Sequence, residues 1–283
     1  MKPFAIAGLQ LVLAPTDNLA LVQQKVSSVM RRFPWVQMIV LSELAVCGAV
    51  PSQAEVLPSD TENKLASLAK QFDIWLVTGS LYEKAEGHVY NTASVVSPEG
   101  MVVARYRKMY PFYPYEKGVS PGADLCLFDI PDVGRFGLSI CYDAWFPETS
   151  RALVCAGAEV IIHPTLTSTN DRDVERAMAR ATAAQQQCYF LDVNGAGEQA
   201  NGRSIFVGPS GEVVHTAGEC EEFIVAEIDM NLVKRSRSRG VLGLGQPLKS
   251  FRDAGHDFSQ RTASSGSDYL STLGKLDMPK RSC

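Results

Sequence analysis

Apolar residues follow two spacings along this chain, and the change from one to the other predicts a mixed α/β architecture. Short apolar runs, typical of buried strands, occupy residues 4–13, 36–41, 74–81, 90–96, 101–106, 125–130, 134–140, 160–163, 189–193, 205–207, 213–215 and 223–228. Between several of these runs, apolar residues recur every three or four positions, which indicates amphipathic helices over 19–33, 65–72, 151–156 and 174–181. No break in this pattern marks a domain boundary, so we expect one α/β domain over 1–253.

Polar residues and prolines set the expected ends of the helices. Asp17 is placed to cap the first helix and Pro34 to close it, and Ser59 to Glu62 has the form of a capping box. Val174, Ala177, Met178 and Ala181 recur at helical spacing and mark a further helix over 174–181.

Three chemically active side chains stand at the ends of predicted strands. Glu43 follows the strand over 36–41, Lys108 follows the strand over 101–106, and Cys141 follows the strand over 134–140. Pro147 is suited to a first helical position, so Cys141 lies at a strand-to-helix turn, beside backbone N–H groups without helical partners. Such a turn holds a nucleophile at the rim of a sheet. A lone buried cysteine is usually structural, but an acid, a cation and a thiol in comparable places favour catalysis.

These residues lie in motifs that resemble those of the nitrilase, or carbon–nitrogen hydrolase, superfamily. Leu41-Ser42-Glu43-Leu44 is similar to its glutamate motif, Tyr106-Arg107-Lys108 to its lysine motif, and 140–148 to its cysteine motif. The resemblance spans most of the chain and implies catalytic roles for Glu43, Lys108 and Cys141. It adds Glu116, because amidases of the family carry a second glutamate eight positions after the lysine, and 116 − 108 = 8. It also implies a four-layer αββα sandwich, with the site at strand ends, assembled into homodimers or larger homo-oligomers.

One motif departs from the family. Before the strand over 189–193, members commonly carry Arg-Ala-x-Glu-Asn, whereas this chain has Thr182-Ala183-Ala184-Gln185-Gln186. Neutral amides replace the charged pair, which weakens any transfer of substrate class from members that carry it. Asn194 matches the family's asparagine after this strand, and we expect it to hold the loops around the pocket.

An aromatic loop follows Lys108, and its two prolines exclude a regular helix. Its aromatic side chains either line a substrate pocket or pack beneath a subunit contact, and the sequence leaves both open. His163 follows a strand as well, but we favour a packed histidine over a general base, because the resemblance already supplies a base. The candidate substrate-binding residues are Tyr110, Phe112, Tyr113, Tyr115, Tyr142, Trp145, Phe146, Thr165 and Leu166.

The composition limits the classes of molecule that we expect this protein to bind. The net charge of −4 and the pI of about 5.7 give no broad basic field for nucleic acid or an anionic membrane, and no apolar run is long enough to span a bilayer. The seven cysteines are odd in number and widely spaced, which favours reduced thiols and a cytoplasmic location. No CxxC or HxxxH spacing indicates a metal site. The basic cluster over 234–239 is expected at a solvated or subunit-facing surface, and the tail over 254–283 is expected to pack on a subunit or to be disordered.

Together these features predict a thiol hydrolase. It would cleave the non-peptide C–N bond of a small amide through a Cys141 thioester, releasing ammonia and a carboxylic acid, with no cofactor or metal. An N-carbamoyl amine amidohydrolase is the alternative, because residues 145–148 also resemble members acting on carbamoylated amines. A nitrilase usually has Cys-Trp-Glu where this chain has Cys141-Tyr142-Asp143. A non-catalytic binding subunit is disfavoured by the complete triad, and a cysteine–histidine hydrolase by the absence of a histidine motif.

Overall fold

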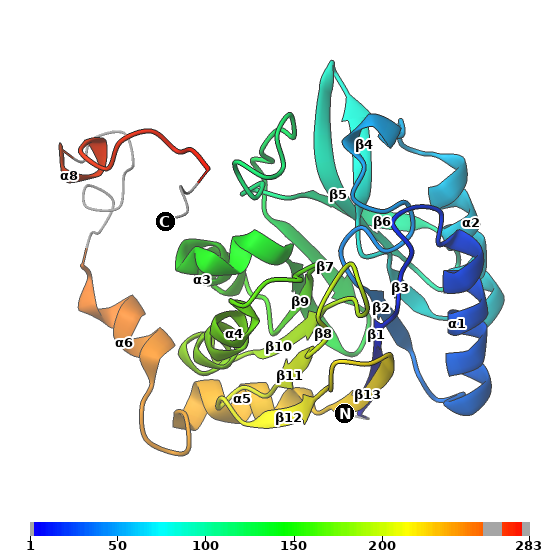
Figure 1. Ribbon diagram of the computed structural model, residues 1–283. Helices are drawn as coiled ribbons and strands as arrows, with labels where there is room; N and C mark the ends of the chain where they lie inside the picture. Colours follow the sequence, from blue (N-terminus) through cyan, green and yellow to red (C-terminus); the bar gives the residue numbers. More distant parts are fainter. Residues whose placement is uncertain (1–2, 257–267, 279–283) are drawn as a thin grey trace.

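The computed structural model describes residues 3–256 and 268–278, and two β-sheets packed face to face form its centre (Figure 1). The first sheet has the order β13-β1-β2-β3-β5-β4, with β6 pairing to β5. Its strands are β1 (Phe4–Gln10), β2 (Met38–Leu41), β3 (Trp75–Val77), β4 (Leu81–Ala85), β5 (His88–Val96), β6 (Val102–Arg107) and β13 (Glu222–Ile228). The second has the order β12-β11-β10-β9-β8-β7. Its strands are β7 (Cys126–Ile130), β8 (Gly134–Leu138), β9 (Val160–Pro164), β10 (Tyr189–Val193), β11 (Ile205–Val207) and β12 (Val213–Thr216).

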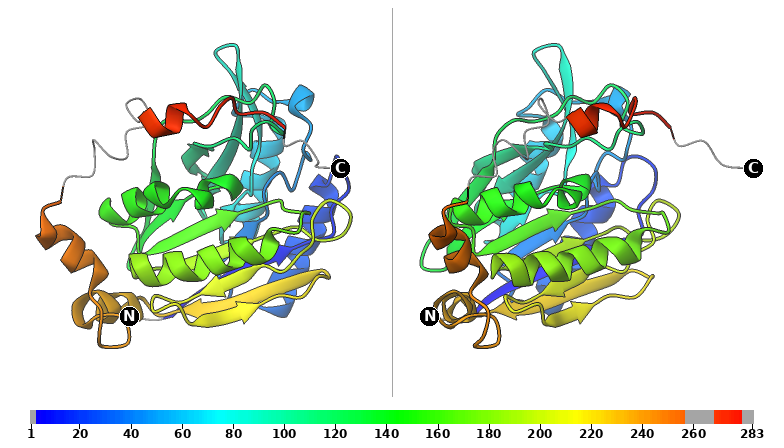
Figure 2. Two further views of the ribbon diagram at one scale, coloured as in Figure 1. Left: turned by 60° about the vertical axis from the view of Figure 1, so that its left-hand side comes forward. Right: turned by 90° about the vertical axis from the view of Figure 1, so that its left-hand side faces the viewer.

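Helices cover the outer face of each sheet. Helices α1 (Leu19–Arg32) and α2 (Asp60–Phe72) lie on one side of the two sheets, and α3 (Pro147–Cys155) and α4 (Arg172–Gln186) lie on the opposite side (Figures 1 and 2). The predicted four-layer αββα sandwich is therefore confirmed. The remaining helical segments are η1 (Pro51–Gln53), η2 (Cys141–Trp145), α5 (Met230–Arg239), α6 (Pro247–Ala254) and α8 (Asp268–Ser271).

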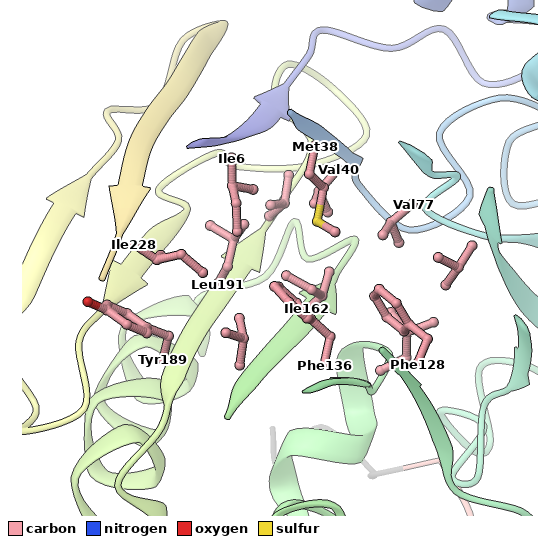
Figure 3. Packing of buried hydrophobic residues seen from close by; sticks show 14 of the residues in the cluster. Ile6, Met38, Val40, Val77, Phe128, Phe136, Ile162, Tyr189, Leu191 and Ile228 are labelled. Atoms are coloured by element: carbon pink, nitrogen blue, oxygen red, sulfur yellow. The ribbon is translucent and has the colours of Figure 1, made fainter. Parts of the chain in front are cut away.

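The core between the sheets is built by alternate residues of their strands. Ile6, Met38 and Val40 of the first sheet face Ile162 and Leu191 of the second (Figure 3). The intervening residues of the same strands pack outward against helices, for example against Val22, Val26 and Val29 of α1. Because the central strands are buried on both faces, they read as continuous apolar runs in the sequence.

The structure corrects two local predictions in the first half of the chain. Asp17 does not cap α1, since Asn18 holds the N-cap position and exchanges hydrogen bonds with the backbone of Ala14. The run over 74–81 is not one strand but ends at β3, because the chain turns at Gly79, where φ is +74°. A Cβ at this glycine would stand 1.9 Å from the carbonyl oxygen of Ser42, so glycine permits the close approach beside Glu43.

The capping box at α2 forms only in part. Ser59 Oγ accepts a hydrogen bond from the Glu62 backbone N–H at 3.1 Å, as predicted. The Glu62 side chain does not return the bond but accepts from Ser94 and Arg105 of the sheet. Tertiary partners therefore replace one half of the local motif.

Helix α4 includes the predicted stretch over 174–181, but its buried side is not made of the apolar residues that marked it. The buried residues are Arg172, Glu175, Ala179, Ala183 and Gln186, whereas Val174 is 49% exposed. A buried arginine and glutamate break the rule that apolar positions mark the inner face, and they do so because other parts of the chain supply their partners.

The structure describes only part of the predicted C-terminal tail. Helix α6 crosses the expected boundary at residue 253, and residues 257–267 and 279–283 of the predicted tail lie outside the described residues. Whether the tail packs on a subunit stays a prediction. Within the described ranges, no helix is both long and apolar enough to cross a membrane.

Candidate active site

The ends of β2, β6 and β8 bring the predicted acid, cation and thiol together. Lys108 Nζ donates to Glu43 Oε1 at 2.8 Å and to Glu116 Oε2 at 2.7 Å, and the lysine side chain is 1% exposed. An ammonium has three donors, and no third acceptor for Lys108 occurs among the described residues. The remaining N–H is available to the oxygen of a bound substrate.

Cys141 begins η2 at the end of β8 and has a φ of +46°, a conformation that non-glycine residues rarely adopt. Asp143 supports this turn, since its carboxylate accepts from the Ile140 N–H at 2.8 Å, the Tyr106 hydroxyl at 2.7 Å and the Tyr110 N–H at 2.9 Å. Burial raises the pKa of Asp143 to about 6. The buried carboxyl thus ties the cysteine turn to β6 and to the loop after Lys108.

The protonation states suit a base next to a neutral thiol. Burial, and then the charge of Glu43, raises the pKa of Cys141 well above its ordinary value. Burial also raises the pKa of Glu43, although Lys108 opposes the rise. Burial alone would lower the pKa of Lys108, but Glu43, Cys141 and Glu116 together raise it well above normal. Lys108 is therefore cationic, and Glu43 is the charged group that acts most strongly on the thiol.

Asn91 is a part of this network that sequence analysis missed. It is fully buried on β5, and its Nδ2 donates to Glu43 Oε1 at 2.8 Å and to Glu116 Oε1 at 3.0 Å. Glu116 also accepts from the backbone N–H of Phe112 at 2.6 Å. One amide thus holds both carboxylates around Lys108. The only sequence signal was a polar residue inside an apolar strand.

Cys141 opens into a cavity of about 440 Å³. Five of the predicted substrate-binding residues line it: Phe112, Tyr115, Tyr142, Trp145 and Leu166. Sequence analysis did not single out the rest of the wall, which consists of Thr167, Ser168, Thr169, Asn170, Asp171 and Glu175. The volume fits a small organic molecule.

The other predicted substrate-binding residues lie outside this lining. Tyr110 stacks on Phe146 with ring centroids 3.6 Å apart, and Phe146 contacts the ring of Tyr142 edge to face. The Tyr113 hydroxyl donates to the carbonyl of Val119. Thr165 is buried and hydrogen-bonds to the Cys141 thiol. These residues support the wall from behind.

His163 and Asn194 also have defined surroundings. Burial lowers the pKa of His163 to about 4, and its Nδ1 is paired with Ser139 Oγ at 2.7 Å, so it is a packed neutral histidine. Asn194 links two loops, since Thr167 N–H donates to its Oδ1 and its Nδ2 donates to the Gly202 carbonyl. Among the described residues, no group of three or more His, Cys, Asp or Glu side chains is placed to hold a metal ion.

Comparison with known proteins agrees with this geometry. A family model described as "Carbon-nitrogen hydrolase" matches residues 4–238. The omega-amidase NIT2 of Homo sapiens is 31% identical over 204 residues, which cover 67% of this chain and 74% of that protein. Saccharomyces cerevisiae Nit3, a member of branch 10 of the nitrilase superfamily, matches with a TM-score of 0.78 at 30% identity, covering 84% of this chain and 94% of that one. An amidase from Nesterenkonia sp. gives 0.74 at 25% identity, covering 83% and 94%. The chain belongs to the carbon–nitrogen hydrolase family, within the nitrilase superfamily, as an amidase-like member.

Proposed function

We propose that this protein is an amidase that hydrolyses a small primary amide through a thioester on Cys141. One observation carries the proposal: the Lys108 ammonium is held between the carboxylates of Glu43 and Glu116, beside a buried thiol that opens into a substrate-sized cavity. The similar proteins named above as an omega-amidase and an amidase support the same class of reaction.

In the first half-reaction, Cys141 Sγ attacks the amide carbon while Glu43 takes the thiol proton. The new oxyanion is met by the third N–H of Lys108 and by the backbone N–H of Tyr142, the residue after the nucleophile. Glu43 then passes its proton to the amide nitrogen, the C–N bond breaks, and ammonia leaves a thioester on Cys141.

In the second half-reaction, Glu43 takes a proton from water as the water oxygen attacks the thioester carbon. The C–S bond breaks, the carboxylic acid leaves, and the thiolate recovers the proton from Glu43. The raised pKa of Glu43, caused first by burial, suits a group that must gain and lose this proton near neutral pH.

Glu116 holds Lys108 rather than exchanging protons. Burial would raise its pKa, but the charge and the hydrogen bond of Lys108 lower it, so it stays ionised. Since it also accepts from Asn91 and from Phe112 N–H, it fixes the ammonium on the side of the cavity.

We extend the proposal to the setting of the enzyme. Its partner is a small amide, with the N-carbamoyl amine as the alternative substrate. The odd number and wide spacing of the cysteines support a cytoplasmic location. The resemblance to the carbon–nitrogen hydrolase family supports a homodimer or larger homo-oligomer.

Trapping the acyl-enzyme tests the proposal. Wild-type protein incubated with a short primary amide and hydroxylamine should release both ammonia and a hydroxamate, while Cys141→Ala should release neither and retain the wild-type circular dichroism spectrum. Carbon dioxide release from an N-carbamoyl amine without hydrolysis of any amide would replace the amidase assignment by the alternative.

A further inference from the structure

The charged residues of the active-site cavity all carry the same sign. Asp171 and Glu175 line it, and no Lys, Arg or His occurs among its described lining residues. The ion-pair network beside the cavity has two carboxylates, Glu43 and Glu116, and one cation among the described residues, Lys108. An anionic substrate would therefore meet an excess of negative charge.

Arg172, the cation paired with the lining residue Glu175, is unable to compensate this charge. Arg172 is fully buried, and its guanidinium has five N–H donors. Two reach Asp192, one reaches Glu175, and the others reach the backbone carbonyls of Gly202 and Arg203. Every donor is used within the protein, so none is left for a substrate carboxylate.

Glu175, in contrast, keeps acceptor capacity toward the cavity. Its Oε1 accepts from Thr167 Oγ1 at 3.1 Å and its Oε2 from Arg172 at 3.0 Å, one described bond for each oxygen. A carboxylate oxygen accepts two hydrogen bonds, so each has a lone pair to offer. The residue is 8% exposed, lines the cavity, and lies near enough to Cys141 for its charge to raise the pKa of the thiol.

The ion group around Arg172 also carries a net charge. Arg172 faces both Asp192 and Glu175, so with all three ionised the group has one negative charge in excess. Burial, and then repulsion by Asp192, raises the pKa of Glu175. A cation bound in the cavity would neutralise the excess negative charge and would lower the raised pKa of Glu175.

Resting on the amidase function proposed above, we propose that Glu175, with Asp171 at the rim, forms a subsite for an ammonium group at the end of the substrate remote from the scissile bond. The substrate class is then an ω-amino amide or its carbamoyl analogue, in which one end meets Cys141 and the protonated amine meets Glu175. The aromatic wall contacts the methylene chain between them.

Matched substrates measure this preference. 4-Aminobutanamide, pentanamide and succinamate differ mainly in a terminal ammonium, methyl or carboxylate group, and a second set one methylene longer covers uncertainty in reach. The ammonium compound should exceed its methyl counterpart in kcat/KM by at least about tenfold, the scale of one charge-assisted hydrogen bond. The carboxylate compound should fall below the methyl compound by a similar factor.

Variants assign the preference to its residue. Glu175→Gln should reduce the ammonium-to-methyl ratio of kcat/KM to about threefold or less. Asp173→Asn is the matched control, because Asp173 stands in the same helical turn but is 68% exposed and does not line the cavity. Its ratio should stay within about twofold of wild type. A purely structural role of Glu175 would lower both rates by one factor, leave the ratio unchanged, and overturn the proposal.

A binding measurement separates this proposal from the amidase function. n-Butylammonium should protect Cys141 against iodoacetamide at concentrations at least about tenfold below those needed for 1-butanol. Protection without turnover of any amide would support the subsite and reject the amidase function. Equal turnover of ammonium and methyl amides with equal protection by the two probes would overturn the subsite and leave the amidase function intact.

Discussion

Replacing Glu116 by Gln removes a charge without removing volume, and the structure predicts its effect in detail. All four groups that Glu116 contacts are donors: Lys108 Nζ at 2.7 Å, Phe112 N–H at 2.6 Å, Asn91 Nδ2 at 3.0 Å and Tyr82 OH at 3.4 Å. A glutamine presents one oxygen and one NH₂, so at least one pair of donors would face each other.

The smallest rearrangement flips the side-chain amide of Asn91, which exchanges the positions of its Oδ1 and Nδ2. Its Oδ1 is buried and has no described partner, so a flipped Asn91 could accept from the new amide. The flip would sacrifice the bond from Asn91 to Glu43. One hydrogen bond to a charged group is worth about 1.5–3 kcal/mol, and about 1.4 kcal/mol corresponds to a factor of ten. We therefore expect kcat of Glu116→Gln to fall by about 10- to 100-fold.

The same variant should move the acidic limb of the pH profile. The charge of Glu116 raises the pKa of Glu43, so its removal lowers that pKa and shifts the acidic limb of kcat/KM to lower pH. The assay is ammonia release from butanamide between about pH 5 and 9. Tyr82→Phe, which removes only the 3.4 Å contact, is the control and should stay within about threefold. A Glu116→Gln enzyme with wild-type kcat would refute the positioning role.

Three further predictions follow from the same geometry. Lys108→Met should lower kcat by at least about 10²-fold, since it removes an oxyanion donor, and turnover within tenfold of wild type would reject that role. Glu43→Gln should lower kcat by at least about 10²-fold, since it removes the base that takes the thiol proton, and turnover within tenfold of wild type would contradict base assistance. His163 has a pKa of about 4 in the folded protein, whereas the ordinary value for histidine in the unfolded chain is 6.5. Between these two values only the unfolded chain binds the proton, so the free energy of unfolding falls as the pH drops below 6.5. Urea unfolding at pH 7 and 5 should show about 2 kcal/mol more loss for wild type than for His163→Gln, and equal losses would exclude this contribution.

Residues at the ends of strands are the easiest to single out from the sequence. Glu43, Lys108 and Cys141 lie one to three positions after the ends of β2, β6 and β8 (43 − 41 = 2, 108 − 107 = 1, 141 − 138 = 3). Such short links leave little freedom in where these residues lie. Their convergence depends on which strands are neighbours in the sheets. Hydrophobic periodicity does not contain this information, and the family resemblance supplied it.

The aromatic residues show where sequence reasoning stops. Phe112 and Tyr115 line the cavity, whereas Tyr110 and Tyr113, from the same loop, do not. All four are aromatic residues that lie close together in one loop, so the sequence does not distinguish those that line the cavity. That depends on how the loop packs. Tyr110 is drawn away by stacking on Phe146, a contact across 36 positions of sequence (146 − 110 = 36).

Helix α4 explains why one departure from the family motif says little about the substrate. The neutral residues that replace the charged pair include Gln185, which is exposed and lies outside the cavity lining. Glu175 lies ten positions earlier (185 − 175 = 10), or about 15 Å along the helix at 1.5 Å per residue. The cavity is thus lined by the first turn of α4, whose buried residues are charged and do not belong to the apolar pattern that marked the helix. That turn is held inward by Asp192 of β10 and by carbonyls after residue 201, partners too distant in sequence for a local pattern to include. Because a buried charge is tolerated only with such partners, the place where local prediction failed is also the place where the cavity acquires its charge.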